Sequence, residues 1–356
     1  GITRRDRLIS YLPLAHVFER GAVESLSLYV GAKLFFADSL ETFVADVKRA
    51  RPTVFHSVPR LWLKFQQGVS AKLPEKKLSV LLRIPLIGRL LKRVVLKGLG
   101  LERTRIAISG SAPIPPELMH WYRGLGLELL EGYGMSENFA YSHVSLPGRS
   151  RIGYVGHPLP GVSQRISPEG EVLVKSAADM KGYYKQAELT RASYTEDGFL
   201  KTGDRGELDS DGRLRLTGRV KELFKTSKGK YVAPAPIENL LLADRNLELC
   251  CVMGAGEPQP FALVVLAEPL RKQLKAGTGD RAGIDAALKR LLHAVNRQVE
   301  EHEQLAFLVV VQDEWQVENG LLTPTLKVKR NVVEDTYGGR MASWYARKHE
   351  EVLWEG

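Results

Sequence analysis

The sequence predicts an α/β protein in three parts: a mostly parallel αβ sheet region, a β-rich antiparallel region and a small α+β region. Apolar runs of strand length alternate with helical patterns over residues 1–150. Gly-Pro turns and short alternating runs dominate residues 151–218, and mixed strand and helix patterns fill residues 219–356. The two changes of pattern between these regions set the predicted boundaries.

Length and composition narrow the class of protein. The 356 residues are 44% hydrophobic and 26% charged, with a formal net charge of +10, which is ordinary for a globular chain and unlike disordered, collagen-like or coiled-coil sequences. No apolar run approaches the roughly 18 residues of a membrane span, and the first residues lack the apolar core of a signal peptide. The two cysteines, Cys250 and Cys251, are adjacent and build no disulfide framework, so we expect a cytoplasmic protein.

The first region predicts alternating strands and helices. The strands are expected at 8–14, 32–38, 52–58, 103–110 and 127–134, and the helices at 41–50, 59–73 and 115–125. Ligands of parallel sheets lie beyond the carboxyl ends of the strands. Two such ends are rich in glycine, at 109–113 and 131–137, and these are the first candidate binding segments.

The second and third regions predict shorter elements. A hairpin turn is expected at 209–214 and a second hairpin around 227–230. The third region then predicts helices at 234–244 and 281–303, strands at 247–255, 261–268 and 305–312, and a terminal helix. The joint between the large and small parts is expected at 218–221.

A basic segment follows the second predicted helix. Between Lys72 and Lys97 there are eight Lys and Arg residues and one acid, Glu75. Pro85 and Gly88 interrupt the helical pattern, which predicts two short helices. Two interpretations stay open: the apolar side packs on the protein, or the segment makes peripheral contact with a membrane. No aromatic-basic platform or helix-turn-helix pattern indicates nucleic acid as a partner.

Three short clusters carry side chains suited to nucleotide chemistry, and each also has a plain structural interpretation. Small residues at 109–113 let a flat ligand approach the backbone, or simply form a turn. Ser136 is able to donate to a phosphate and Glu137 to hold Mg²⁺, or the two form an N-cap and first-turn acid. Asp204 is able to accept hydrogen bonds from ribose hydroxyls, or it is simply a turn residue. The signatures CxxC, HExxH, GxSxG and GxxxxGK[ST] are absent from the sequence.

In their order along the chain, eight segments resemble the AMP-forming acyl-adenylate superfamily, which includes acyl-CoA synthetases, adenylation domains and luciferases. The residues of these segments are most similar to those of the long-chain fatty acyl-CoA synthetases. The segments are YLPLAHVFER, FHSVPRLWLKF, ISGSAPIPPEL, EGYGMSE, GYVGHPLPGV, GFLKTGD, GRVKELFKTSKGKYVAP and LTPTLKVKR.

The resemblance implies a role for each part of the chain. Residues 1–150 would be the C-terminal portion of a large nucleotide- and acyl-binding domain, 151–218 its β-rich subdomain, and 219–356 a mobile C-terminal lid. The nucleotide would contact Gly110, Ser111, Ala112, Pro113, Glu131, Gly132, Tyr133, Gly134, Met135, Ser136, Asp204 and Arg219. Glu137 would bind Mg²⁺, His16 would border the acyl pocket, and Lys221 would be the hinge.

The resemblance also implies a two-step reaction with ATP, Mg²⁺ and coenzyme A. Lys327 would bridge the substrate carboxylate and the α-phosphate during adenylation. The lid would then rotate and present the residues of the thioester step, which are Lys225, Lys228, Gly229, Lys230 and Tyr231. The expected partners are therefore a fatty acid, ATP and CoA.

One departure from the family pattern is clear. The family's Ser/Thr/Gly-rich loop ending in Pro-Lys-Gly, which wraps the β- and γ-phosphates, has no match in residues 1–356. We therefore expect the sequence to be the C-terminal portion of a longer protein. Two alternatives stay open: a ligase for another carboxylic acid, or a non-catalytic nucleotide-binding fragment.

Overall fold

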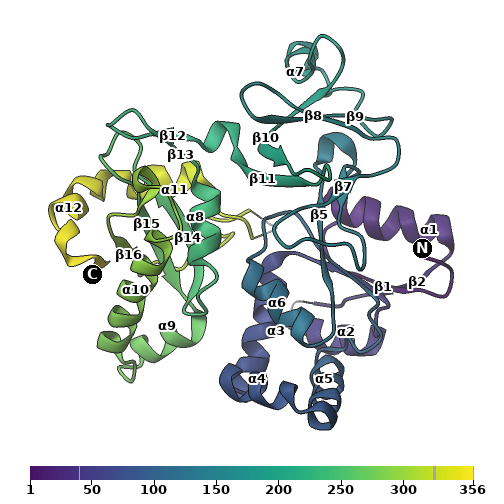
Figure 1. Cartoon of the computed structure of the whole chain (residues 1–356), viewed down its shortest axis with the longest axis horizontal. Helices are drawn as coiled ribbons and strands as arrows, with labels where there is room; N and C mark the ends of the chain where they lie inside the picture. The colour runs from purple at the N-terminus through teal and green to yellow at the C-terminus, as the bar shows by residue number, and fades with distance from the viewer. Residues whose placement is uncertain (40, 324–325, 356) are drawn as a thin grey trace. The chain divides into compact units, whose positions relative to one another are not determined.

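The computed structural model describes residues 1–39, 41–323 and 326–355, apart from the side chains of residues 75 and 76. It divides into two compact units, Gly1–Leu216 (unit 1) and Thr217–Gly356 (unit 2), drawn in Figure 1. The α/β fold class is confirmed. The predicted division into three parts at 150 and 218 stays a prediction.

Unit 1 contains a five-stranded sheet in the order β3-β4-β5-β6-β7. Its first three strands, β3 (Val54–Ser57), β4 (Ile106–Ser109) and β5 (Leu129–Tyr133), are parallel, and β6 (His143–Val144) and β7 (His157–Pro158) are antiparallel. The strands β1 (Arg7–Ser10) and β2 (Lys33–Phe36) form a separate parallel pair. The predicted mostly parallel sheet is therefore present, as two pieces.

The helices of unit 1 begin and end where the sequence gives local reasons. The π-helical segment Glu19–Ser25 leads into α1 (Leu26–Val30), and the other helices are α2 (Phe43–Ala50), α3 (Pro59–Lys72), α4 (Glu75–Arg83), α5 (Pro85–Leu99), α6 (Pro116–Gly124) and α7 (Ala187–Ala192). Three of them, α3, α5 and α6, start with proline, whose fixed φ suits the first helical position. Gly100 ends α5 in the left-handed conformation, and a Cβ there would approach the backbone of Lys48 in α2 to 2.7 Å. Only glycine fits that crossing.

The parallel strands are covered by a dense aromatic core. Trp62 of α3 lies edge-on to Phe55 of β3 and to Tyr122 of α6, with ring centroids 5.1 and 5.0 Å apart. The buried Tyr122 hydroxyl donates to the Trp62 carbonyl at 2.7 Å, which satisfies its polar atom. This core packs α3 and α6 against the parallel strands beneath the strand ends.

The β-rich part is a four-stranded antiparallel sheet in the order β11-β10-β9-β8, and its strand β11 runs across the boundary between units 1 and 2. The strands are β8 (Ser163–Ile166), β9 (Glu171–Lys175), β10 (Leu200–Leu208) and β11 (Leu214–Arg219). The predicted turn at 209–214 joins β10 to β11. Val172, Val174, Leu200 and Leu214 form its buried core.

Unit 2 is built on a mixed sheet in the order β14-β15-β16-β17. The strands are β14 (Leu247–Met253), β15 (Phe261–Leu266), β16 (Leu308–Val310) and β17 (Val352–Trp354), and the predicted hairpin forms from β12 (Phe224–Lys225) and β13 (Tyr231–Val232). Its helices are α8 (Pro234–Leu241), α9 (Glu268–Lys275), α10 (Arg281–Asn296), α11 (Arg330–Tyr337) and α12 (Met341–Ala346). Separate apolar clusters cover the two faces of the sheet.

Three predicted elements differ from the structure, and one of them is the expected terminal helix, in whose place α11 and α12 are followed by the strand β17. The strand expected at 8–14 ends at Ser10, and the chain enters a helical segment that had no counterpart in the prediction. The helix expected to reach 303 ends at Asn296, because its side chain exchanges hydrogen bonds with the Leu305 backbone at 2.8 and 2.9 Å. The basic segment does form the two predicted helices, α4 and α5. None of the helices in the described ranges combines the length and apolar character needed to cross a bilayer.

Candidate functional site

The two glycine-rich segments meet at the carboxyl ends of adjacent parallel strands. Ser109, the last residue of β4, pairs in register with Glu131 of β5. A Cβ placed on Gly110 would lie 3.4 Å from the Gly132 carbonyl oxygen, so the two segments are in contact without side chains between them. The predicted residues Gly110–Pro113 and Glu131–Met135 therefore share one edge of the sheet. Ala112 and Pro113 are exposed there.

Backbone strain is concentrated at this edge. Ser111, Phe139 and Ala140 have φ of 72°, 55° and 54°, a region that side chains other than glycine rarely adopt. A Cβ on Gly134 would come within 2.6 Å of the Ala140 backbone, so only glycine allows the loop to fold back. Strained residues that cluster in one place indicate a functional loop.

Glu137 is held by a tyrosine from a distant loop. It lies in the 3₁₀ turn Ser136–Asn138, and its Oε1 accepts from the Tyr183 hydroxyl at 2.8 Å. Its backbone carbonyl accepts from the Met180 amide at 2.6 Å. Burial, followed by the hydrogen bond to Glu137, raises the pKa of Tyr183. The sequence analysis missed Tyr183, because no local signal connects it to Glu137.

Asp204 is aimed at Tyr133 by a distortion of β10. The register with β9 shifts between Lys201 and Arg205, and Gly203 takes a φ of 72°. Such a bulge reorients the side chain that follows. Asp204 Oδ2 accepts from the Tyr133 hydroxyl at 2.8 Å. The structure thus joins two of the predicted nucleotide residues, which lie 71 positions apart in the chain.

The residues around Glu137 fit a magnesium ion that is shared with a ligand. One carboxylate oxygen is engaged by Tyr183, and the other is outside that hydrogen bond. Within the described residues, no group of three His, Cys, Asp or Glu side chains could form an all-protein metal site. Mg²⁺ is often held by one or two carboxylates together with substrate phosphates and water, so this donor set suits it.

Two ionisable side chains are buried behind the edge. Glu131 is 7% exposed, and its Oε2 accepts from the Gly153 amide at 3.0 Å. Burial raises the pKa of Glu131 to about 8, although the Gly153 hydrogen bond opposes this. Burial also lowers the pKa of His143 to about 4, against the effect of its 2.7 Å hydrogen bond to Gln164. Glu131 therefore faces the protein interior and braces the Gly153 loop.

His16 lies in the turn that packs beside the Gly110 edge. Its Nδ1 accepts from the Phe18 amide at 3.2 Å, and the Phe18 ring lies 3.6 Å from the Cβ position of Gly110. Phe18 also meets the His56 ring edge-on, with centroids 4.9 Å apart. This places the predicted acyl-pocket segment against the predicted adenine segment.

A buried acid–base pair supports that turn. Glu19, fully buried, accepts from the Leu12 amide at 3.4 Å, and its Oε2 lies 3.7 Å from Nε2 of the buried His56. Glu19 Oε1 and both His56 ring nitrogens have no hydrogen-bond partner among the described residues. The sequence analysis missed this pair, although Glu19 within an apolar helical pattern was a signal that could have indicated it.

The predicted lid residues are exposed on unit 2. Arg219 ends β11, and Lys221 lies in the 3₁₀ turn Val220–Glu222. The hairpin between β12 and β13 turns at Gly229, with a φ of 79°, and Lys225 lies 5.7 Å from the Tyr231 ring centroid. Its remaining predicted residues are Lys228 and Lys230, which are exposed.

Lys327 is exposed on a tight turn of unit 2. Its amide donates to Thr323 Oγ1 at 3.0 Å, its carbonyl accepts from the Thr323 amide at 2.8 Å, and the preceding Leu326 has a φ of 62°. Pro324 and Thr325 of the same motif lie outside the described residues. The turn presents a lysine on a backbone that its own hydrogen bonds hold in place.

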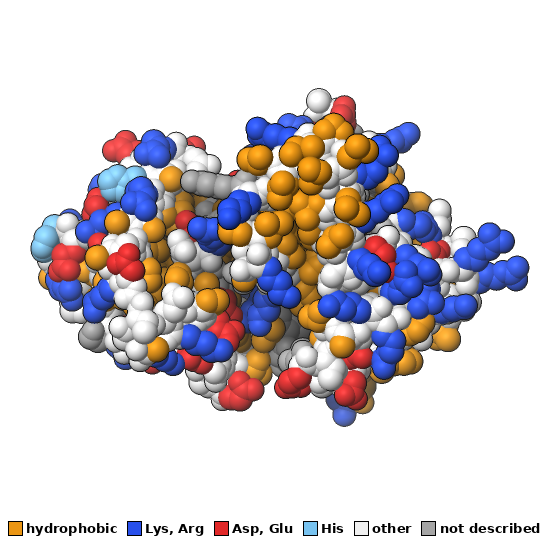
Figure 2. All heavy atoms as spheres, turned by 90° about the horizontal axis from the view of Figure 1, so that it is seen from below, with side chains coloured by type: hydrophobic (Ala, Val, Ile, Leu, Met, Phe, Trp, Pro, Cys, Tyr) orange, Lys and Arg blue, Asp and Glu red, His pale blue; other side chains and the backbone are white. Residues whose placement is uncertain are grey.

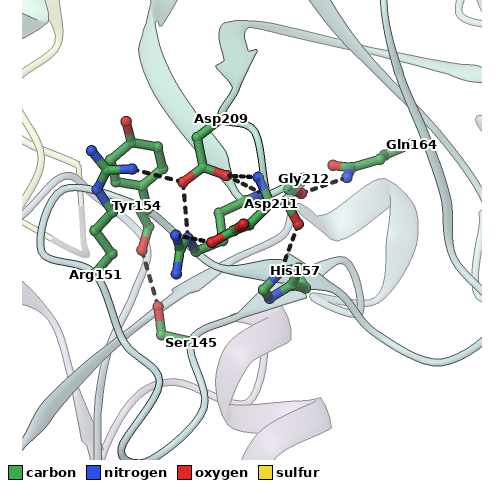
Figure 3. Close-up of polar contacts among 9 residues, drawn as sticks. Ser145, Arg151, Tyr154, His157, Gln164, Asp209, Asp211 and Gly212 are labelled. Atoms are coloured by element: carbon green, nitrogen blue, oxygen red, sulfur yellow. Dashed lines mark hydrogen bonds and ion pairs between the residues drawn. The ribbon is translucent and has the colours of Figure 1, made fainter.

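A separate polar network stabilises the β-rich part (Figure 3). Asp209 accepts from Arg151 and Arg213 at 2.9 Å each, and His157 contacts the Asp211 carbonyl at 3.0 Å. Burial raises the pKa of Asp209, but hydrogen bonds from Arg213 and Arg151 outweigh it and hold the pKa well below its usual range. This network fixes the turn between β10 and β11, one end of the strand that carries Asp204.

Two family models match the chain. Residues 1–184 match the AMP-binding enzyme model, and residues 222–349 match the AMP-binding enzyme C-terminal domain.

Curated relatives are similar over nearly the whole chain. A Mycobacterium bovis long-chain-fatty-acid–CoA ligase, FadD15, is 32% identical over 98% of this chain and 63% of its own length. Human long-chain-fatty-acid–CoA ligase 1 is 30% identical over 96% of this chain and 55% of its own. The chain thus spans somewhat more than half the length of these relatives.

Solved structures share the fold. The adenylation domain of a carboxylic acid reductase from Segniliparus rugosus, in complex with AMP and a carboxylic acid, has a TM-score of 0.76 at 26% identity, covering 96% of this chain and 55% of that one. The anthranilate CoA ligase AuaEII has a TM-score of 0.72 at 21% identity, covering 94% of this chain and 60% of that one, and shows the fold alone.

Proposed function

The chain belongs to the family of AMP-binding enzymes, and from this we propose that it carries the adenylate and lid parts of a long-chain fatty acid:CoA ligase. The single observation that carries the proposal is the convergence at one sheet edge in unit 1. Gly110 contacts Gly132, Tyr133 donates to Asp204, and Glu137 is fixed by Tyr183. An adenylate needs a backbone surface without side chains for its adenine, an acceptor for its ribose hydroxyls and an acid near its phosphate. The glycine segments, Asp204 and Glu137 would supply these.

The first step joins two anions. A carboxylate oxygen of the fatty acid attacks the α-phosphorus of ATP, a phosphorus–oxygen bond forms, and pyrophosphate leaves with the electron pair. Positive charge near the reacting oxygens lowers the barrier. We assign this role to Lys327, and Mg²⁺ held by Glu137 would supply further charge. Ser136, exposed beside Glu137, would donate to the adenylate phosphate.

The adenosine part is assigned to the strand-end segments. Gly110, Ser111, Ala112 and Pro113 would line one side of the adenine, and Gly132 and Tyr133 the other. Asp204 and Arg219 would accept from and donate to the ribose hydroxyls. Gly134 and Met135 shape the loop, and Glu131 braces it from behind through Gly153.

The second step exchanges the leaving group. The sulfur of CoA attacks the acyl carbonyl carbon, a thioester forms, AMP leaves with the electron pair, and the thiol proton passes to solvent. We assign the hairpin residues Lys225, Lys228, Gly229, Lys230 and Tyr231 to the CoA side, and Lys221 to the hinge about which the lid turns. The cationic hairpin suits the phosphates of CoA.

The preference for a long acyl chain is supported by the relatives. Several of those with about 30% identity over nearly all of this chain are named as long-chain fatty acid ligases, and others are named only as fatty-acid or acyl-CoA ligases. His16 and Phe18 would border the acyl entrance next to Gly110. A ligase for another carboxylic acid is the second candidate, favoured by the structural likeness to the carboxylic acid reductase domain.

An inert acyl-adenylate analogue tests the proposal without needing a β,γ-phosphate loop. We expect isothermal titration calorimetry to show that palmitoyl-sulfamoyl adenosine binds the chain at least about tenfold more tightly than benzoyl-sulfamoyl adenosine. Asp204→Ala should weaken both, and Asp211→Ala, at the remote turn, should weaken neither. Tighter binding of the benzoyl compound would favour the second candidate. Absence of binding by either compound would contradict the adenylate site.

A turnover assay separates the enzyme from a binding fragment. ATP–pyrophosphate exchange driven by palmitate is expected from a polypeptide that contains this chain together with a phosphate-binding loop. Binding of the analogue without any exchange in that polypeptide would identify a non-catalytic nucleotide-binding protein instead.

A further inference from the structure

Helix α5 has more apolar surface than the core of unit 1 uses. Its inner side packs on the core through Leu91, Val95 and Leu99. Its outer side leaves Leu86, Ile87, Leu90 and Val94 between 48% and 80% exposed. At about 100° per residue, these four side chains lie within one stripe roughly 100° wide. The helix therefore has two apolar sides, one packed on the core and one exposed to solvent.

Helix α10 of unit 2 is a helix whose large apolar side chains all pack in a core, and it serves as the comparison for α5. It is nearly the same length and buries Ile284, Leu288, Leu292 and Val295. None of the exposed large hydrophobic side chains in the described residues belongs to it. The outer stripe of α5 is thus a feature that the fold does not require of a helix of this kind.

Helix α4 extends the apolar surface. Val80 is 59% exposed, and Ile84, between the two helices, is 41% exposed. The helices cross closely, because a Cβ on Gly88 would lie 2.5 Å from the Leu82 carbonyl oxygen. That contact fixes α4 and α5 as one surface, which we name the α4–α5 face, defined by Val80, Ile84, Leu86, Ile87, Leu90 and Val94.

Cations surround this face. Helix α5 contains Arg89, Lys92, Arg93 and Lys97 and no acid. Arg89, Arg93 and Lys97 are exposed, and no carboxylate in the described part of the chain forms an ion pair with them. Figure 2, which looks onto the lower side of Figure 1 where α4 and α5 lie, shows an apolar patch bordered by Lys and Arg side chains.

We propose that the α4–α5 face docks on an anionic lipid surface, with its aliphatic side chains in the acyl boundary and its cations on the headgroups. Aliphatic residues flanked by cations, in helices too short to span, are the chemistry of an interfacial helix. The complementarity is with negative phosphate groups on an apolar layer. Nucleic acid would match the charge alone, since the face carries no aromatic side chain on which a base could stack.

Vesicle co-sedimentation of the chain tests this proposal. Binding to phosphatidylglycerol–phosphatidylcholine vesicles should be at least about tenfold stronger than to phosphatidylcholine alone, and should weaken as salt rises. The triple variant Leu86→Ser/Leu90→Ser/Val94→Ser and the double variant Arg89→Glu/Arg93→Glu should each reduce binding about tenfold or more. The inner residues Leu91, Val95 and Leu99 stay untouched, so the fold is kept.

Matched control variants change the same residue types elsewhere. Leu189→Ser/Leu208→Ser removes two other exposed leucines, and Lys272→Glu/Arg290→Glu reverses two cations of unit 2. Neither control should alter vesicle binding by more than about twofold.

Three results would overturn the proposal: no binding to either vesicle, equal losses in patch and control variants, or tighter binding to a DNA duplex than to anionic vesicles. Loss of vesicle binding in a longer polypeptide that contains this chain would also overturn it, because the face would then be an internal contact. The assay contains no substrate, so its outcome is independent of the proposed ligase activity.

Discussion

The two units of the molecule differ in where they keep their polar side chains. Among the described residues, the buried Asp, Glu, His, Asn, Ser and Thr side chains lie in unit 1, with Thr226 of unit 2 as the single exception. In unit 1 several of them stand behind the strand ends, such as Ser57, Ser109 and Glu131. Unit 2 has an apolar interior and displays Lys225 and Lys327 on its surface. Unit 1 therefore keeps polar and ionisable side chains in its interior, whereas unit 2 has an apolar interior and places its candidate functional cations on its surface.

The largest effect is expected in the apolar interior of unit 2. Leu288 of α10 is fully buried, and Leu288→Ala should lower the free energy of unfolding by about 2–5 kcal/mol through lost burial and a cavity. Urea denaturation followed by circular dichroism measures it. Leu90→Ala on the exposed side of α5 is the matched control, with an expected change below about 0.5 kcal/mol. Similar losses at both positions would contradict the assignment of the two helices.

A surface cation of unit 2 should matter for chemistry and little for stability. Lys327→Ala should slow palmitate-driven ATP–pyrophosphate exchange by about 10²-fold or more, in the polypeptide that supports exchange. Thioester formation from supplied palmitoyl-adenylate should fall less than about tenfold, and the thermal midpoint should not change. Lys348→Ala, also exposed, serves as the control. Equal loss in both half-reactions would contradict the proposed role.

The buried ionisable side chains of unit 1 should make the free energy of unfolding depend on pH. The folded pKa of Glu131, about 8, is above its ordinary value, so its contribution is lost as pH rises from about 4.5 to 8. The folded pKa of His143, about 4, is below its ordinary value, so its contribution is lost as pH falls from about 6.5 to 4. Of these two groups, only Glu131 changes its contribution between pH 6.5 and 8, which should lower the free energy of unfolding by about 2 kcal/mol.

Glu131→Gln should abolish that slope between pH 6.5 and 8. Urea titrations of the wild type and the variant at several pH values measure the difference. Glu238→Gln, a matched change in unit 2 at a carboxylate that forms an ion pair with Arg330, should leave the slope intact. A slope that persists in Glu131→Gln would show that the interior of unit 1 is not its source.

The smallest effect is expected at the Glu19–His56 pair, which we assign as positioning residues for the turn that carries His16 and Phe18. Glu19→Ala should weaken palmitoyl-sulfamoyl adenosine about tenfold while leaving AMP within about twofold, and Glu19→Gln should restore most of the loss. Calorimetry with both ligands makes the comparison. A parallel loss for AMP would mean that Glu19 supports the fold in general and not the acyl side.

The sequence was informative wherever a local signal sets the structure. Pro85 separates α4 from α5 as predicted, whereas Gly88 lies within α5; the turn at 209–214 and the hairpin around Gly229 form where glycine permits them. Motif order also brought together the segments of Gly110 and Gly132, because adjacent parallel strands end at the same edge.

Long-range pairings were beyond a single sequence. Tyr183 reaches Glu137 across 46 positions, and Glu19 meets His56 from another element, so neither has a local signature. The end of β1 at Ser10 was missed because Leu12 and Leu14 alternate with their neighbours as a strand would, whereas the chain passes through turns before the helical segment at Glu19. Tertiary contacts, not propensity, decide these positions.

The π-helical segment Glu19–Ser25 has a consequence for sequence change over time. Its hydrogen bonds reach five residues back, as from the Leu26 amide to the Gly21 carbonyl, so it holds one residue more than an α-helical turn of the same path. The loss of a single codon there would close the segment into an α-helical turn, because the wider π turn holds one extra residue. A deletion between Glu19 and Val23, both fully buried, would leave them three positions apart and change the angle between their side chains by about 100°. A deletion there, without any substitution, would change the surface that this segment and Phe18 form beside Gly110.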